Sequence, residues 1–173
     1  MTAGSRQNNP FKLMGLPIQY AIDIKALEAT YRQLMQHYHP DNYVSEPMVV
    51  RKSAVQMSTR INDAMYQLRS PLSRAITWMN LHGLSKDNER GSSLGTDFLM
   101  EQMRWRERIA DADADQVCSI QNEILEKLQS FESEFESLSV DEEKIIASGW
   151  ELIEKWQFFE KLAKVVKEKG ESL

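Results

Sequence analysis

Gln36-His37-Tyr38-His39-Pro40-Asp41-Asn42-Tyr43 is the stretch of sequence around which the rest of the chain is organised. Pro40 has no backbone N–H and disfavours a helical conformation at the residue before it, so a helix arriving from the N-terminal side should end near Tyr38. His39 and Asp41 then flank a stiff residue at the end of a helical arm. This geometry favours presentation of both side chains to a partner. Taken alone, the three residues also fit a simple helix stop followed by a turn.

Amphipathic helices are predicted on both sides of this stretch. The first begins after Asp23, which can cap its N-terminus, and the second follows Pro47, a residue suited to a first helical turn. Two sets of apolar residues recur at steps of three and four, which indicates one buried stripe on each helix: Ile24, Leu27, Tyr31, Leu34 and Tyr38, then Val50, Ala54, Met57, Ile61, Ala64 and Leu68. An antiparallel helical hairpin follows, and the segment 11–17 should help to close its core.

A further short helix is predicted after Pro71, ending at Gly83, which can adopt the left-handed C-cap conformation. Its expected buried face consists of Leu72, Ala75, Ile76 and Met79. Residues 84–95 have a turn-like composition and are expected to connect two domains.

Three helices forming an antiparallel bundle are expected in the second half of the chain. Thr96 can cap the first, which should reach about Ala110. The second and third are predicted from two apolar stripes: Val117, Ile120, Ile124, Leu128, Phe131, Phe135 and Leu138, then Ile145, Leu152, Trp156, Phe159, Ala163 and Val166. The charged tail from Lys167 onward is expected to fray. The predicted fold class is therefore all-α.

Composition and charge restrict the possible functions of these 173 residues. The net charge of −5 combines +4 over residues 1–90 (11 basic, 7 acidic) with −9 over residues 91–173 (10 basic, 19 acidic), which suggests surfaces for two different partners. The small, dispersed basic excess argues against nucleic acid. No apolar run approaches the ~20 residues of a membrane-spanning helix, and the polar segment 1–9 resembles neither a signal nor a transit peptide. The cytoplasm is the expected compartment.

No constellation of catalytic residues is recognisable, so the chain is not expected to be an enzyme or to need a cofactor. His37, His39 and Asp41 are close in sequence, but no second cluster completes a metal site, and none is predicted. Cys118 cannot form an intramolecular disulfide because it is the single cysteine, and it is interpreted as a small packing residue.

Several motifs together resemble the HscB branch of the J-domain co-chaperones, which serves iron–sulfur cluster biogenesis. The motifs are His39-Pro40-Asp41, Arg60-Ile61-Asn62-Asp63-Ala64, Leu81-His82-Gly83, Asp97-Phe98-Leu99-Met100-Glu101-Gln102-Met103 and Trp156-Gln157-Phe158-Phe159-Glu160-Lys161-Leu162. They span most of residues 11–166. The resemblance implies an L-shaped two-domain protein: a J-domain over 11–83, a connecting loop over 84–95 and a helical bundle over 96–170.

In that family the J-domain docks on the ATPase of a DnaK-type chaperone and stimulates ATP hydrolysis. The resemblance implies that His39, Pro40 and Asp41 are the trigger, and that Arg32 belongs to the basic face of the preceding helix. This chain has Gln33, His37 and Asn42 where family members often carry Lys or Arg. We therefore expect docking to depend only weakly on salt.

The family's second domain binds the scaffold protein IscU through an apolar patch flanked by acids. The matching residues here are Leu99, Met100, Met103, Glu107, Asp111 and Phe158. Met-rich apolar surface suits an adaptable interface. Alternatively, Leu99 and Met103 face the bundle core. Arg104 departs from the pattern, because relatives often carry an acid there.

These observations predict a co-chaperone that stimulates a specialised HscA-type ATPase and delivers IscU to it during iron–sulfur cluster assembly. Two alternatives remain open. One is a J-domain protein for another client, and the other is a helical adaptor that does not stimulate the ATPase.

Overall fold

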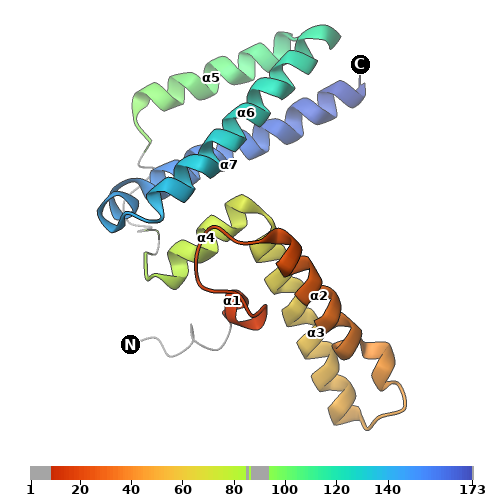
Figure 1. The fold of residues 1–173 in the computed structure, drawn as a ribbon. Coiled ribbons are helices and arrows are strands. Elements are labelled where there is room, and N and C mark those ends of the chain that lie inside the picture. Colours follow the sequence, from red (N-terminus) through yellow and green to blue (C-terminus); the bar gives the residue numbers. More distant parts are fainter. Residues whose placement is uncertain (1–8, 85, 87–93, 173) are drawn as a thin grey trace. The chain divides into compact units, whose positions relative to one another are not determined.

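The structure is a computed structural model of the chain and describes residues 9–84, 86 and 94–172. These residues form seven α-helices and one short 3-10 helix and contain no strand, so the all-α class is confirmed (Figure 1). The chain divides into two compact units, Met1–Leu84 and Ser85–Leu173. The predicted connecting loop lies largely outside the described residues. The L shape stays a prediction.

The first unit is built on a long helical hairpin. It contains α1 (Pro10–Leu13), α2 (Ile24–Tyr38), η1 (Pro40–Tyr43), α3 (Met48–Arg69) and α4 (Pro71–Leu81). Helices α2 and α3 lie side by side and antiparallel, as expected (Figure 1). Asp23 caps α2 by accepting hydrogen bonds from the N–H groups of Lys25 and Ala26. The side chains of Phe11 and Met14 are buried, so the segment around α1 does help to close this core.

The predicted stripes are buried unevenly along the hairpin. Leu27 of α2 and Ile61 and Leu68 of α3 are inaccessible to solvent, whereas Val50 is exposed. The difference has a simple cause, since α1 and α4 pack near one end of the hairpin and the other end projects beyond them (Figure 1). The projecting end carries the η1 turn.

Helix α4 buries a different face from the one predicted. Ala75 and Met79 are buried as expected, but Arg74 and Trp78 are buried as well. Arg74 is tolerated there because its Nη1 donates to the Leu68 carbonyl at 2.8 Å and its guanidinium lies 4.9 Å from the ring centre of Tyr20. Gly83 ends the helix with φ +74°, as its position predicted.

The second unit contains α5 (Thr96–Asp111), α6 (Ala114–Leu138) and α7 (Glu142–Ser172). Helices α6 and α7 form a long antiparallel pair whose shared core includes Ile120, Ile124, Phe135, Trp156 and Phe159 (Figure 1). Helix α5 is attached to this pair through few buried side chains, chiefly Phe98 and Ile109. Most of its surface is therefore left exposed.

Three expectations for the second unit are wrong. Thr96 is the first residue of α5, and Gly95 occupies the N-cap without a side-chain bond. The tail does not fray before Ser172, because Lys169 Nζ donates to the carbonyls of Ile109 and Ala110 at 2.6 Å each. Cys118 is exposed on the surface of α6, so it is not a packing residue.

Candidate functional site

The docking loop, defined as residues 39–43, follows the end of α2. As predicted, the helix ends at Tyr38. His39 has the extended conformation that a following proline favours (φ −61°, ψ 130°). The loop is more regular than expected, because Pro40–Tyr43 form a 3-10 turn. The Asn42 N–H closes this turn on the His39 carbonyl at 3.0 Å.

Two side chains of the docking loop cap the end of α2. A helix leaves its last carbonyl groups without intrahelical partners. Asn42 Nδ2 donates to the Gln36 carbonyl at 2.8 Å, and the Tyr43 hydroxyl donates to the His37 carbonyl at 3.1 Å. These bonds tie the loop back onto the helix that carries it. Sequence reasoning missed them, although an amide and a phenol soon after a helix stop were a usable signal.

The side chains of His39 and Asp41 are exposed at the tip of the loop, by 49% and 83%. The Asp41 N–H donates to His39 Nδ1 at 3.3 Å, while Asp41 Oδ2 lies 3.6 Å from the same nitrogen. Nδ1 accepts when it is unprotonated and donates when it is protonated, so the two contacts exclude one another. With Nδ1 unprotonated, the Asp41 carboxylate is available to a partner. Arg32, also exposed, lies on the helix that leads into the loop.

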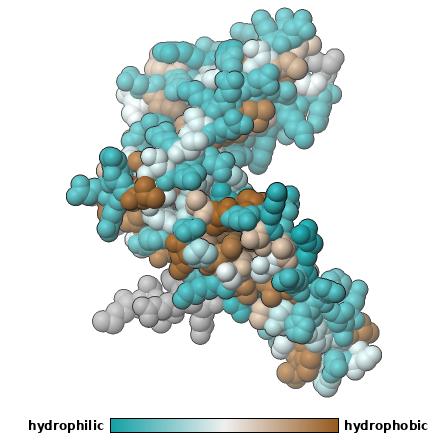
Figure 2. Space-filling model, viewed as in Figure 1, coloured by the Kyte–Doolittle hydropathy of each residue, from teal (hydrophilic) through white to brown (hydrophobic). Residues whose placement is uncertain are grey.

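Apolar side chains surround the docking loop on the same projecting end. Val44, Met48 and Val49 are between 64% and 82% exposed. Figure 2 shows hydrophobic surface at this end of the first unit. The tip therefore combines an exposed carboxylate with exposed apolar surface.

A second exposed surface lies on α5 and is called here the methionine face: Leu99, Met100 and Met103. These side chains are about half exposed, at 52%, 48% and 54%. The alternative that Leu99 and Met103 face the bundle core is therefore wrong. Glu107 and Asp111 are exposed further along the same helix. The surface is apolar near the start of α5 and acidic near its end.

Phe158 of α7 differs from the other predicted residues of this surface because its side chain is only 8% exposed. Its ring lies edge-on to Phe98 at 5.6 Å and to Phe159 at 5.4 Å between ring centres. Arg106 covers it, with Cζ 5.8 Å from the ring centre. Phe158 therefore supports α5 from beneath, and only a small part of it reaches the surface.

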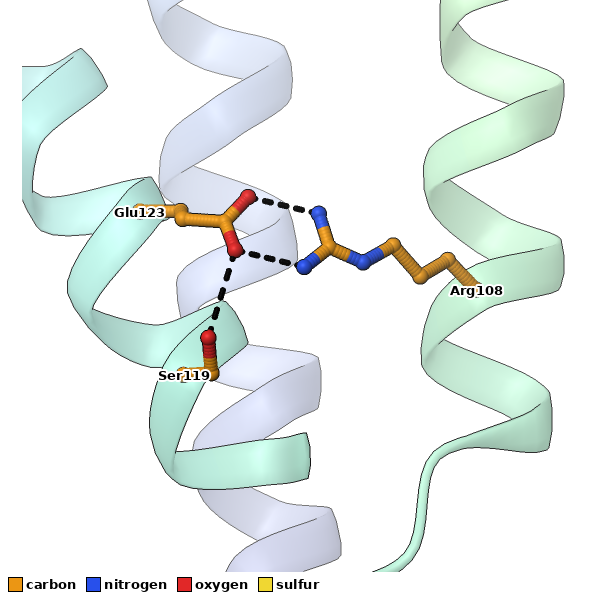
Figure 3. A network of polar contacts seen from close by, with 3 residues as sticks. All are labelled: Arg108, Ser119 and Glu123. Carbon is orange, nitrogen blue, oxygen red and sulfur yellow. Dashed lines mark hydrogen bonds and ion pairs between the residues drawn. The ribbon is translucent and has the colours of Figure 1, made fainter. Parts of the chain in front are cut away.

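The opposite edge of α5 is tied to α6 by an ion pair. Arg108 donates from both terminal nitrogens to the Glu123 carboxylate, at 2.6 and 2.5 Å, and the Ser119 hydroxyl donates to the same carboxylate at 3.4 Å (Figure 3). The hydrogen bonds from Arg108 hold the pKa of Glu123 below its ordinary value, and those to Glu123 raise the pKa of Arg108. Sequence reasoning missed this pair, because nothing local links residues fifteen positions apart.

The geometry offers binding surfaces rather than a reaction centre. Among the residues that the structure describes, no three His, Cys, Asp or Glu side chains come together as metal ligands. Within the same residues, every helix is too short or too polar to cross a bilayer.

Known proteins resemble this chain in sequence over both units. A family described as "HSCB C-terminal oligomerisation domain" matches residues 94–167. The "Co-chaperone protein HscB homolog" of Chromobacterium violaceum is 36% identical over 129 residues, which are 73% of this chain and 74% of the relative. The protein of the same name from Bordetella petrii is 34% identical over 155 residues, 88% of this chain and 91% of the relative.

Solved structures resemble it as well. The chaperone HscB from Vibrio cholerae is 29% identical, with a TM-score of 0.84 over 95% of this chain and 98% of the other. The human co-chaperone protein HscB is 25% identical, with a TM-score of 0.87 over 96% of this chain and 84% of the other. Sequence and structural relatives thus carry the same name.

Proposed function

Because the chain belongs to the HscB family of co-chaperones, we propose that it binds a specialised HscA-type chaperone through its first unit and the iron–sulfur scaffold IscU through its second. The proposed activity is stimulation of the chaperone's ATPase together with delivery of the scaffold. The observation that carries this proposal is the presence of two exposed sites, the docking loop and the methionine face, on separate compact units.

The docking loop is the proposed trigger for ATP hydrolysis. His39, Pro40 and Asp41 lie together at an exposed tip, and Arg32 supplies positive charge on the adjoining helix. An exposed Asp41 carboxylate can form a directional, charge-assisted pair with an arginine of the chaperone. The capping bonds from Asn42 and Tyr43 pre-organise the loop, so less conformational entropy is lost on docking.

The methionine face is the proposed site for IscU. Leu99, Met100 and Met103 present half-exposed apolar side chains, and methionine adapts its shape readily to a partner. Glu107 and Asp111 flank the patch and would steer a basic region of the scaffold towards it. Phe158 contributes mainly by holding α5 in position through its contact with Phe98.

No catalytic chemistry is assigned to the chain itself. By binding both partners at once it would raise their effective concentration near one another and bias the chaperone towards hydrolysis. We propose the cytoplasm as the compartment and no direct role for nucleic acid or membrane.

The test is steady-state ATP hydrolysis by the cognate HscA-type chaperone, with this protein and IscU added singly and together. We expect each to stimulate modestly and the pair to stimulate by more than the sum. Stimulation that is indifferent to IscU would keep the ATPase assignment and point to another client. Absence of any stimulation would reduce the docking loop to a helix stop and leave a structural adaptor.

A further inference from the structure

A groove runs along the edge of α5 that faces α6, next to the methionine face. It encloses about 510 Å³ and is lined by Asp97, Met100, Glu101, Arg104, Trp105 and Arg108. Met100 belongs to both the groove and the methionine face, so the two surfaces are continuous. A partner that covers Met100 would also cover part of the groove.

The three arginines in the middle of α5 are not equivalent. Arg106 lies over the ring of Phe158. Arg108 lies over the ring of Trp105, and Glu123 balances its charge through two hydrogen bonds (Figure 3). Arg104 is exposed and takes part in no ion pair among the residues that the structure describes. It is therefore the cation of this groove that is left for a partner.

The position of Arg104 determines what that partner must supply. Arg104 lies one turn after Met100 and one turn before Arg108, so it shares their side of the helix. Burying a guanidinium without an acceptor carries a large desolvation cost. A protein that seals the methionine face must therefore either avoid Arg104 or place an acceptor against it. The planar fork of arginine is best matched by a carboxylate.

The groove also limits where such a carboxylate can lie. At the end nearer the start of α5, Asp97 and Glu101 are acidic and would repel it, and Glu101 already accepts a bond from Trp105 Nε1 at 3.4 Å. At the other end Arg104 and Arg108 provide positive potential. Met100 and Trp105 form the apolar wall between them, which suits a hydrocarbon stem.

We propose that this groove receives an acidic side chain of the scaffold protein, with its carboxylate on Arg104 and its stem against Met100 and Trp105. The inference rests on the proposed function of the methionine face. It assigns a charge to the partner at one position, and so makes Arg104 a residue that selects among scaffolds.

The test is the dissociation constant for IscU, measured by titration calorimetry at two salt concentrations with the full-length chain. Loss of a charge-assisted bond predicts about tenfold weaker binding for Arg104→Gln. Arg104→Glu should weaken binding further, and Arg104→Lys should weaken it least. The matched control is Arg51→Glu, the same change at an exposed arginine outside the methionine face, which should leave the constant unchanged.

A charge-reversal scan of IscU identifies the partner residue. Changing each exposed acid of IscU to lysine should reveal one variant that binds the natural chain poorly and binds Arg104→Glu well. The inference is overturned if Arg104→Glu binds like the natural chain while Met103→Ala binds weakly, since the methionine face would then be used without the groove. If the natural chain does not bind IscU at all, the proposed function itself fails and takes the inference with it.

Discussion

Asn42 determines the shape of the docking loop more than its position beside His39-Pro40-Asp41 suggests. Its side-chain amide is the donor that closes the loop onto the Gln36 carbonyl. A lysine or arginine at this position would add charge for docking but could not reproduce the same short amide bond. We interpret Asn42 as an exchange of charge attraction for pre-organisation.

Asn42→Asp tests this interpretation, because it keeps the size of the side chain and replaces the donor with an acceptor that the Gln36 carbonyl repels. We expect the concentration of co-chaperone needed for half-maximal ATPase stimulation to rise about fivefold to thirtyfold, since a lost hydrogen bond costs about 1–2 kcal/mol. The maximal stimulation at saturation should be nearly unchanged.

The matched control is Asn80→Asp, the same change at an exposed position of α4, which should leave the half-maximal concentration as it was. A half-maximal concentration unaffected by Asn42→Asp would show that the cap has no part in docking. The break at Pro40 was predictable from the chemistry of proline alone. The caps from Asn42 and Tyr43 were not, because a side chain's partner depends on where the following turn directs it.

Among the elements, α5 combines the proposed scaffold site with the least extensive packing in the second unit. It is held by the buried side chains of Phe98 and Ile109, by the Arg108–Glu123 pair and by the bonds from Lys169 to its last carbonyls. Because few contacts hold it, each one affects how well the methionine face is positioned.

The Arg108–Glu123 pair predicts a pH dependence. Arg108 lowers the pKa of Glu123 from its ordinary value of 4.5, so the pair stabilises the fold above that value and the contribution is lost as the pH falls through the lower, folded-state pKa. Both side chains are about half exposed, so we expect the contribution to stay below about 1 kcal/mol. At neutral pH, Glu123→Gln should lower the free energy of unfolding by this small amount.

The deficit of Glu123→Gln should disappear at pH 3, where Glu123 of the natural chain becomes protonated. Urea unfolding at both pH values measures it, with the exposed Glu126→Gln on the same helix as control. A deficit that persists unchanged in acid would contradict the ion-pair explanation.

The periodicity of apolar residues predicted the helices better than it predicted their ends. Steps of three and four residues located α2, α3, α6 and α7 because one face of each is buried. The end of α7 was wrong because Lys169 is held by carbonyls of α5, about sixty residues earlier in the chain. A local pattern contains no information about such a contact.

On the scale of the whole molecule, the two units differ in charge and in proposed partner. The motifs spread over residues 11–166 were enough to predict the family, and the relatives confirm it. Exposure could not be predicted in the same way: Leu99, Met103 and Phe158 are all apolar residues at helical spacing, yet the first two are exposed and the third is buried. Only the packing of α5 on α7 separates them.

Two sites on separate units predict separable losses of function. His39→Gln should abolish ATPase stimulation and leave the affinity for IscU unchanged. The double change Leu99→Ala and Met103→Ala should weaken IscU binding and leave the stimulation that occurs without IscU intact. Both are exposed positions, so neither change should lower the melting temperature appreciably. Loss of both functions in either variant, with an unchanged melting curve, would contradict the division between the units.

The hydrogen bonds of the docking loop have a consequence for folding and for engineering. The four that shape it join residues two, three and six positions apart, so the loop closes over a very short length of chain. Such short closures cost little entropy and can form as soon as α2 does. The recognition element is thus encoded by one continuous segment, and that segment is portable: its shape would travel with it onto another helical hairpin.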